Sequence, residues 1–266
     1  FYETVWFYVA LTLLTAGALF GIYKWRVADI EKRNRELKKV NSELDKFVYS
    51  ASHDLRAPLA SVLGLVNVAR LGDGKDIPLY LDLIEKSIQR LDGFIRDIID
   101  FSRNARMEII REEITFNTLI HEVMADLRYL DEKNRILRIV TVNGQGVFHS
   151  DSRRLKIILT NLISNAIKYH NLRKEDPFIE VKVDYTETQA AIRVIDNGSG
   201  IAEQHMLNIF KMFYRANENI KGSGLGLYIV NETVEKLRGE ISVSSKLDEG
   251  TTFTVSLPAI GKLNAN

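Results

Sequence analysis

The chain has 266 residues, of which 45% are hydrophobic and 27% are charged, and its formal net charge is +1. This composition is ordinary for a globular protein, and the length predicts more than one domain. The near-neutral charge gives no reason to expect a nucleic-acid partner. The sequence has no cysteine, which excludes disulfides, thiol chemistry and zinc sites built from Cys and His.

The first apolar segment is Val5–Tyr23, which has no charged residue. A helix of this length spans about 30 Å, the thickness of a membrane hydrocarbon core. Lys24 and Arg26 follow at once and place the carboxyl side in the cytoplasm. A signal peptide and a buried core helix are the alternatives, but residues 1–4 lack the basic start of a signal peptide. We therefore predict a transmembrane helix over residues 5–23.

Residues 24–46 are strongly charged and are predicted to form a helical, coiled-coil linker. Its apolar positions are spaced by sevens, threes and fours; they are Ile30, Leu37, Val40, Leu44 and Phe47. No glycine or proline occurs between Val27 and Pro58, so the membrane helix is expected to continue without a break.

The next helical stretch opens a region predicted over residues 47–107. Its apolar face consists of Phe47, Ala51, Leu55, Leu59 and Val62. His53 and Asp54 lie off this face and are expected to point at solvent. Asp54 can accept the imidazole N–H of His53, which leaves the other ring nitrogen unprotonated and nucleophilic. A proline inside a helix bends it, so Pro58 predicts a bend beside the histidine.

The second helix of this region is predicted over residues 78–105 and carries two apolar stripes. One stripe consists of Ile77, Leu81, Ile84, Ile88, Leu91, Ile95 and Ile98, and the other of Tyr80, Ser87, Phe94 and Phe101. One helical hairpin cannot cover both stripes, whereas two hairpins can do so as an antiparallel four-helix bundle. The pattern therefore predicts a homodimer with His53 on the outside of the bundle.

Residues 108–260 change to a mixture of strand and helix patterns, followed by a tail at 261–266. Strands are predicted over 114–116, 136–142, 147–148, 178–185, 190–195, 240–245 and 252–257, and helices over 118–130, 152–170 and 225–237. This order predicts a two-layer α/β sandwich, so the fold class is a multidomain α+β protein.

One polar cluster lies on the predicted helix over 152–170. Asn161, Asn165 and Lys168 follow a spacing of four and three, so they share one face. Neutral amide oxygens can hold Mg²⁺ while nucleotide phosphates supply the charge, and a lysine can pair with a phosphate. The alternative is a plain solvated face, although asparagine is a poor helix former.

Two glycine-rich clusters follow. Asp196-Asn-Gly198-Ser-Gly200 ends a predicted strand, where a buried aspartate can accept the amine of adenine. Gly222-Ser-Gly224-Leu225-Gly226 opens a helix whose amides can hold a phosphate. Between them, the aromatic run ending at Arg215 suits a lid over a nucleotide, and Arg215 and Lys221 can meet phosphates. The alternative for the first cluster is an ordinary turn that ends a strand. The alternative for the aromatic run is a segment of the core.

Together these motifs resemble bacterial sensor histidine kinases over roughly residues 27–260. Ser52-His53-Asp54-Leu55-Arg56-Ala57-Pro58-Leu59 resembles the phosphoacceptor box, and the clusters from Asn161 to Gly226 resemble the N, G1, F and G2 boxes. Gly250-Thr-Thr252-Phe resembles the last glycine-rich element. The resemblance implies a Bergerat ATP-binding sandwich after the dimeric bundle.

The resemblance also implies roles for residues. His53 and Asp54 would be catalytic, Asn165 and Asn161 would hold Mg²⁺, and Asp196 would bind adenine. The implied ATP-binding residues are Asn161, Asn165, Lys168, Tyr169, Asp196, Gly198, Gly200, Arg215, Gly222, Gly224, Leu225, Gly226 and Thr252. The implied activity is ATP-dependent autophosphorylation of His53, followed by transfer to an aspartate of a response regulator receiver domain on a separate chain or outside this sequence.

The implied location is a bacterial inner membrane, with the kinase domains cytoplasmic and a sensor preceding residue 1. Two alternatives remain: another ATPase with the same nucleotide fold, and a membrane scaffold with an inactive kinase module. The chain also departs from the family at Ala57. Thr or Asn often stands four residues after the histidine and positions water for dephosphorylation of the regulator, so weak phosphatase activity is expected.

Overall fold

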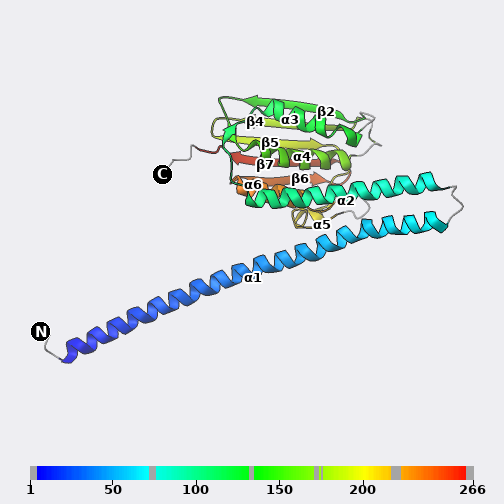
Figure 1. Ribbon diagram of the computed structural model, residues 1–266. Coiled ribbons are helices and arrows are strands. Elements are labelled where there is room, and N and C mark those ends of the chain that lie inside the picture. The colour runs from blue at the N-terminus through cyan, green and yellow to red at the C-terminus, as the bar shows by residue number, and fades with distance from the viewer. Residues whose placement is uncertain are drawn as a thin grey trace. The chain divides into compact units, whose positions relative to one another are not determined.

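The structure, a computed structural model, describes residues 5–71, 76–131, 135–170, 174, 176–216 and 223–261 (Figure 1). The chain forms two compact units, residues 1–54 and 55–266. Gly222 and Lys221, two of the predicted nucleotide contacts, lie outside the described residues.

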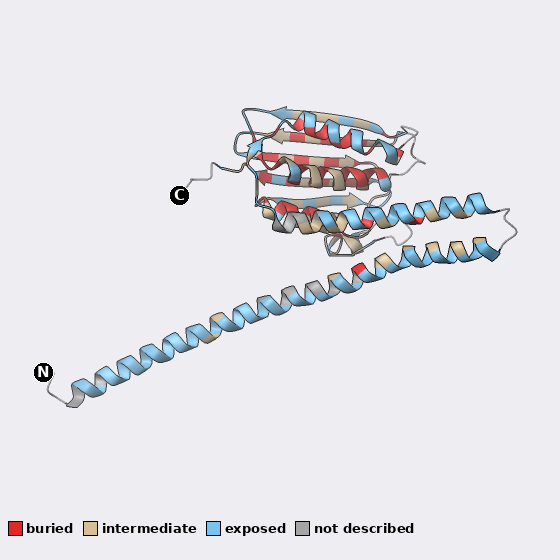
Figure 2. Ribbon diagram, viewed as in Figure 1, coloured by how far each residue is buried: buried red, intermediate tan, exposed pale blue. Residues whose placement is uncertain are grey.

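The first helix, α1, runs over Val5–Leu71 with Pro58 inside it, which confirms the expected uninterrupted helix. Within the described residues, one segment, Phe7–Arg35, is long and apolar enough to cross a membrane by length and composition. It overlaps the predicted span over residues 5–23. Figure 2 shows that the described side chains of this segment are almost all exposed.

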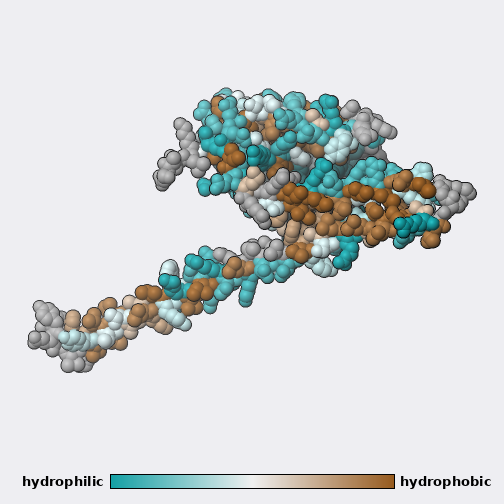
Figure 3. All heavy atoms as spheres, viewed as in Figure 1, coloured by the Kyte–Doolittle hydropathy of each residue, from teal (hydrophilic) through white to brown (hydrophobic). Residues whose placement is uncertain are grey.

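Helix α2 runs over Ile77–Arg106, and its two apolar stripes have different surroundings. Ser87 and Phe94, from the second stripe, are buried within the protomer, whereas Leu81, Ile88 and Ile95, from the first, are exposed. Figure 3 shows apolar surface along the hairpin helices. The exposed residues of the first stripe are therefore available to pack against another surface.

The part of the chain that follows α2 contains a mixed five-stranded sheet. It contains β2 (Leu137–Gly144), β4 (Phe178–Tyr185), β5 (Gln189–Asp196), β6 (Glu240–Lys246) and β7 (Gly250–Pro258). Their order across the sheet is β2-β4-β5-β7-β6, with β2 and β4 parallel and the other pairs antiparallel. Alternating burial along β4, β5 and β7 is the expected pattern for strands with one covered face.

Two short strands, β1 (Glu112–Glu113) and β3 (His149–Ser150), pair outside this sheet. They lie next to the predicted strands over 114–116 and 147–148 rather than on them. Ile114 and Phe148, which suggested those strands, are buried core residues just beyond the pairing. The Ile114 N–H donates to the Phe148 carbonyl at 2.9 Å, so the chain stays close there without a longer ladder.

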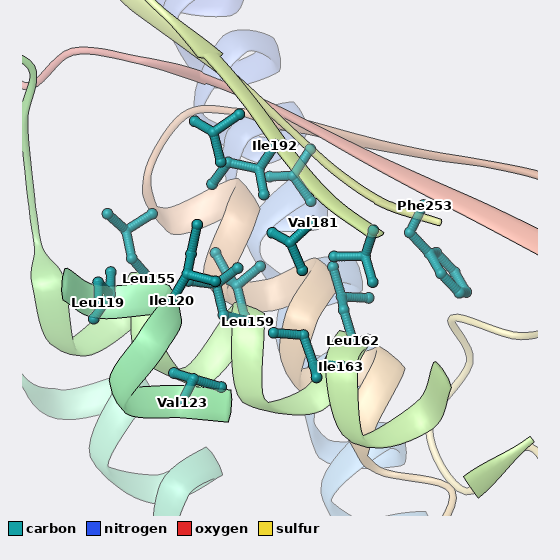
Figure 4. Packing of buried hydrophobic residues seen from close by; sticks show 14 of the residues in the cluster. Leu119, Ile120, Val123, Leu155, Leu159, Leu162, Ile163, Val181, Ile192 and Phe253 are labelled. Atoms are coloured by element: carbon teal, nitrogen blue, oxygen red, sulfur yellow. The ribbon is translucent and has the colours of Figure 1, made fainter. Parts of the chain in front are cut away.

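Helices α3 (Phe116–Asp126), α4 (Ser152–Lys168) and α6 (Gly226–Lys236) cover one face of the sheet, as Figures 1 and 4 show. The short helices η1 (Arg128–Asp131) and α5 (Glu203–Met206) lie in the connections. Helix α3 begins earlier than the prediction over 118–130, because Phe116 is part of its buried face. It also ends earlier, at Asp126, and the 3₁₀ helix η1 follows after Leu127. The core contains Ile120 of α3, Leu159 of α4 and Val181 of β4, and the two-layer sandwich is confirmed.

A buried ion pair of the sandwich is hydrogen-bonded to the chain segment that follows α2. Asp151 caps α4 by accepting from the Arg154 N–H at 3.1 Å, and its carboxylate also pairs with the Arg154 guanidinium. That guanidinium donates to the carbonyls of Met107 at 2.6 Å and Glu108 at 3.1 Å. A buried charge is tolerated only when paired and hydrogen-bonded, so these contacts hold the connection to α2 firmly.

Candidate functional site

His53 has the environment of an accessible nucleophile. Its side chain is 74% exposed, and its Nδ1 lies 3.1 Å from Oδ1 of Asp54. When Nδ1 carries the proton and donates it to this carboxylate, Nε2 presents its lone pair to solvent. The exposed position and the Asp54 contact therefore both agree with the sequence prediction.

The polar face of α4 contains two asparagines that differ in their hydrogen bonding. Asn161 donates from Nδ2 to the Ile157 carbonyl at 2.9 Å, and its Oδ1 faces Gly226, where an added Cβ would approach it to 2.8 Å. Among the described residues, the half-buried Asn165 side chain has no hydrogen-bond partner, so its amide is available to a ligand. Asn161 is therefore engaged with the start of α6, and Asn165 fits an oxygen-ligating role better.

At the end of β5, Asp196 is 9% exposed and accepts from the Gly198 N–H at 2.8 Å. Its cross-strand neighbour on β7 is Thr251, which is also buried, and the Thr251 N–H donates to it. Thr252 instead pairs with Ile195 and lies on the opposite face of the sheet. Sequence reasoning selected Thr252 and missed Thr251, although the alternation of Phe253, Val255 and Leu257 along this strand identifies the shared face.

The turn after β5 is tied to α4 at one side. The Ser199 N–H donates to the Tyr169 carbonyl at 2.9 Å, and an added Cβ on Gly198 would lie 2.5 Å from that carbonyl oxygen. Only glycine permits such an approach without a shift of the backbone. Gly200 continues the same turn, whose Ser199 carbonyl accepts from the Asp248 N–H at 2.8 Å. The predicted residues of this turn are thus brought beside the C-terminal end of α4.

Lys174 closes the other side of this turn, and sequence reasoning did not identify it. Its Nζ donates to the carbonyls of Glu249 at 3.0 Å and Gly198 at 3.4 Å. The ammonium group therefore bridges the β5 turn and the β6–β7 turn beside Asp196. A lysine in a polar connection has no sequence signal that distinguishes it, because its role depends on two distant carbonyls.

The aromatic segment expected to form a lid packs against the loop that opens α6. Phe213 adopts φ 61°, and Gly224 adopts φ +71° directly against its backbone. Phe210 contacts Phe253 of β7 edge to face, with ring centroids 6.4 Å apart. Leu225 is fully buried and precedes Gly226, the first residue of α6. The described part of this loop therefore holds the N-terminus of α6 in place, where the helix dipole favours an anion.

Charged groups surround the exposed end of α4. Neighbouring protein atoms partly desolvate the Lys168 ammonium although solvent reaches the side chain; this lowers its pKa, and the charge of Asp97 on α2 acts against that shift. Burial raises the pKa of Tyr169, and the charge of Arg215 opposes this. Lys168 and Arg215 thus both lie near the end of α4 where nucleotide phosphates are expected.

The electrostatics of Asp196 predict a pH limit for nucleotide binding. Burial raises the pKa of Asp196 from 3.8 to about 6, against the N–H donors of Gly198 and Thr251 and the charge of Lys174. Protonation removes the charge and an acceptor, so ATP affinity should fall as the pH drops through about 6. The ratio of wild-type to Asp196→Asn affinity, measured by titration calorimetry from about pH 8 to about pH 5, cancels the nucleotide's own titration.

The same raised pKa of Asp196 predicts that the loss of ATP affinity at low pH is not caused by unfolding. A carboxyl whose pKa is raised in the folded state binds protons on folding, so the contribution of Asp196 to stability increases as the pH falls from about 6 toward 3.8. Asp196→Asn should therefore not destabilise the fold near neutral pH. A wild-type to variant affinity ratio that stays constant across this pH range would contradict the prediction.

These features define a nucleotide-binding α/β sandwich in one chain with a helix that presents an acid-paired histidine. The family described as "His Kinase A (phospho-acceptor) domain" matches residues 43–106. The family described as "Histidine kinase-, DNA gyrase B-, and HSP90-like ATPase" matches residues 150–260. The two matches lie on α1–α2 and on the sandwich, respectively.

Individual relatives agree with these matches. The histidine protein kinase SaeS of Staphylococcus aureus is 30% identical over 241 residues, covering 86% of this chain and 68% of SaeS. The methanogenesis regulatory histidine kinase FilI of Methanothrix harundinacea is 31% identical over 234 residues, covering 86% of this chain and 26% of FilI. The solved structure of histidine kinase ThkA in complex with response regulator protein TrrA has a similar fold, with TM-score 0.66 and 22% identity over 84% of this chain and 64% of that one.

The chain belongs to the histidine kinase family. It spans 25–33% of the length of the first curated relatives that it matches.

Proposed function

We propose that this chain is an ATP-dependent protein-histidine kinase that transfers the γ-phosphoryl group of ATP to Nε2 of His53. The observation that carries this proposal is the exposed His53 ring with Nδ1 on Asp54, in one chain with the nucleotide-site residues. Asp54 orients the ring and accepts the Nδ1 proton while Nε2 attacks the γ-phosphorus, the bond from the γ-phosphorus to the bridging oxygen breaks, and ADP leaves. Phosphoryl transfer depends mainly on positioning and on neutralising charge, which agrees with these residues.

The nucleotide substrate is expected to lie beside the end of α4. Asp196 accepts the amine of adenine, Lys168 and Arg215 face the phosphates, and the N-terminus of α6 adds a positive field. Bound Mg²⁺ neutralises phosphate charge. The Asn165 amide oxygen fits this ion, with Asn161 as a second oxygen. Mg²⁺ in nucleotide sites is usually held by one or two protein oxygens together with the phosphates, so the metal is expected to bind together with the nucleotide.

Incubation with γ-labelled ATP tests the proposal. A kinase yields an acid-labile protein label, as a phosphohistidine does. ADP release without label would instead support an ATPase of the same fold, and neither product would support an inactive scaffold.

The active form is proposed to be a homodimer through residues 47–107. The exposed stripe that includes Leu81, Ile88 and Ile95 on α2 supports this, because such a stripe on a monomer would remain in contact with water. Leu59 and Leu63 on α1 are exposed as well. A polypeptide of residues 27–107 is expected to sediment as a dimer, and a folded monomer would contradict the four-helix bundle.

The apolar segment of α1 is proposed to anchor the chain in a bacterial inner membrane through residues 5–23. The support is the segment Phe7–Arg35, which has the length and composition of a membrane span. Lys24 and Arg26 place the kinase domains on the cytoplasmic side. A chain that stays soluble without detergent after expression would contradict the anchor.

The phosphoryl group on His53 is proposed to pass to an aspartate of a response regulator receiver domain. The similarly folded histidine kinase ThkA has been solved in complex with response regulator protein TrrA, which supports this class of partner. The exposed side chain of His53 is accessible to such a partner.

Ala57 predicts that phosphatase activity toward the regulator is weak. It lies four residues after His53 on α1, and a methyl group can neither donate nor accept a hydrogen bond to position water. Ala57→Thr should accelerate dephosphorylation of a phosphorylated regulator, by roughly tenfold or more if the hydroxyl orients the attacking water. Fast dephosphorylation by the wild type that does not change in Ala57→Thr would contradict this prediction; both rates are measured with and without ADP.

A further inference from the structure

Asp97 of α2 is hydrogen-bonded to the loop that opens α6. The Ser223 hydroxyl donates to Oδ2 of Asp97 at 2.5 Å, and the same hydroxyl oxygen accepts from the Leu225 N–H at 3.1 Å. Leu225 immediately precedes the first residue of α6. A carboxylate from the helical hairpin is therefore linked through one hydroxyl to the positive end of a helix in the sandwich.

A second observation places Asp97 on the phosphate side of the nucleotide site. Its negative charge acts on Lys168, where it opposes the effect of burial. Lys168 belongs to the polar face of α4, and Ser223 belongs to the glycine-rich loop. Asp97 thus interacts with Lys168 and with the loop at the N-terminus of α6, two of the features that are expected to meet the phosphates.

An aromatic contact lies close by along the same pair of helices. The ring centroids of Phe101 on α2 and Tyr228 on α6 are 5.8 Å apart. Phe101 is four residues after Asp97, so both side chains lie on the same side of α2. The Asp97 contact is therefore part of an α2–α6 interface rather than an isolated surface pair.

We propose that Asp97 occupies an anion position beside α6 and Lys168, and that it must leave this position for the phosphates of ATP to bind. This inference rests on the proposed kinase function. A carboxylate and a phosphate repel each other at short range, so the two anions compete for the same positive groups. Movement of α2 away from the sandwich then raises the affinity for ATP, which makes the hairpin a regulator of nucleotide loading.

The experiment compares Asp97→Asn with the wild type as full chains in detergent, in the presence of Mg²⁺. Asparagine keeps an oxygen that accepts from Ser223, so the variant removes the charge and preserves the contact. The ligands are the non-hydrolysable ATP analogue AMPPNP and adenosine, titrated by calorimetry. Asp82→Asn is the matched control, because it removes the same charge from an exposed position of α2 that pairs with Lys86.

Asp97→Asn should bind AMPPNP roughly three- to tenfold more tightly than the wild type, with unchanged affinity for adenosine. The gain should shrink as salt increases, since salt screens charge repulsion. Asp82→Asn should match the wild type with both ligands. Ser223→Ala, which breaks the tether but keeps the charge, should give a smaller gain for AMPPNP.

Unchanged AMPPNP binding by Asp97→Asn would overturn the proposal. Weaker binding would also overturn it and would indicate that Asp97 assists the metal or the nucleotide. An equal gain for adenosine would overturn it as well, because adenosine has no phosphate for the charge to repel. Failure of the folded wild type and all three variants to bind either ligand would overturn the proposed kinase function itself, and with it this inference.

Discussion

His53→Gln should accept no phosphoryl label from γ-labelled ATP while it binds the nucleotide with wild-type affinity. Glutamine preserves the helix and the polarity of this exposed position, but it has no imidazole nitrogen to attack phosphorus. Because the side chain of His53 is 74% exposed, the substitution leaves no cavity and should not change the fold. The loss should be complete rather than partial, since the nucleophile itself is removed.

The labelling assay has a matched control in His121→Gln. His121 is an exposed histidine on α3 and belongs to no proposed site, so this variant should be labelled like the wild type. Persistent acid-labile labelling of His53→Gln would assign the phosphoacceptor role to another histidine. Loss of nucleotide binding in His53→Gln would instead show that the substitution perturbs the sandwich.

Asn165→Ala should lower both the affinity for Mg-ATP and the labelling rate, by roughly 10- to 100-fold. The Asn165 amide is the one that the structure leaves without a partner among the described residues of α4, so its removal affects a ligand rather than the protein. Alanine is a better helix former than asparagine, so thermal stability should be unchanged or slightly higher. Calorimetry with and without Mg²⁺ and the labelling assay measure these effects.

The dependence on the metal distinguishes a lost ligand from general damage. The affinity difference between Asn165→Ala and the wild type should disappear when EDTA removes Mg²⁺. Asn231→Ala is the control, because Asn231 lies on α6 and donates to Glu235 at 2.8 Å. Wild-type kinetics in Asn165→Ala would mean that the metal site lies elsewhere.

Much of the fold followed from periodicity alone. The predicted strand over 178–185 coincides with β4, and the helix predicted over 152–170 differs from α4 only at its C-terminal end. The uninterrupted helix through His53 followed from the absence of glycine and proline between Val27 and Pro58. Local features such as the pairing of His53 with Asp54 were also predictable, because the two residues are adjacent in the chain and their side chains are within reach of each other.

Other features were visible only in the tertiary structure. Thr251 rather than Thr252 stands beside Asp196, because the register of β5 with β7 decides which side chain shares its face. Asn161 turns its Oδ1 toward Gly226, which depends on how closely α6 packs against α4. The bonds of Lys174 to two backbone carbonyls also depend on turns far apart in the chain.

The sequence by itself therefore determined the elements, the order of the motifs and the residue types available for chemistry, because hydrophobic spacing and turn residues act locally. Only the tertiary structure decided which of those residues meet. Asp97 and Ser223 are joined by one hydrogen bond across a long stretch of chain, and no local pattern marks either partner. Such contacts depend on strand register and helix packing, which the whole core sets together.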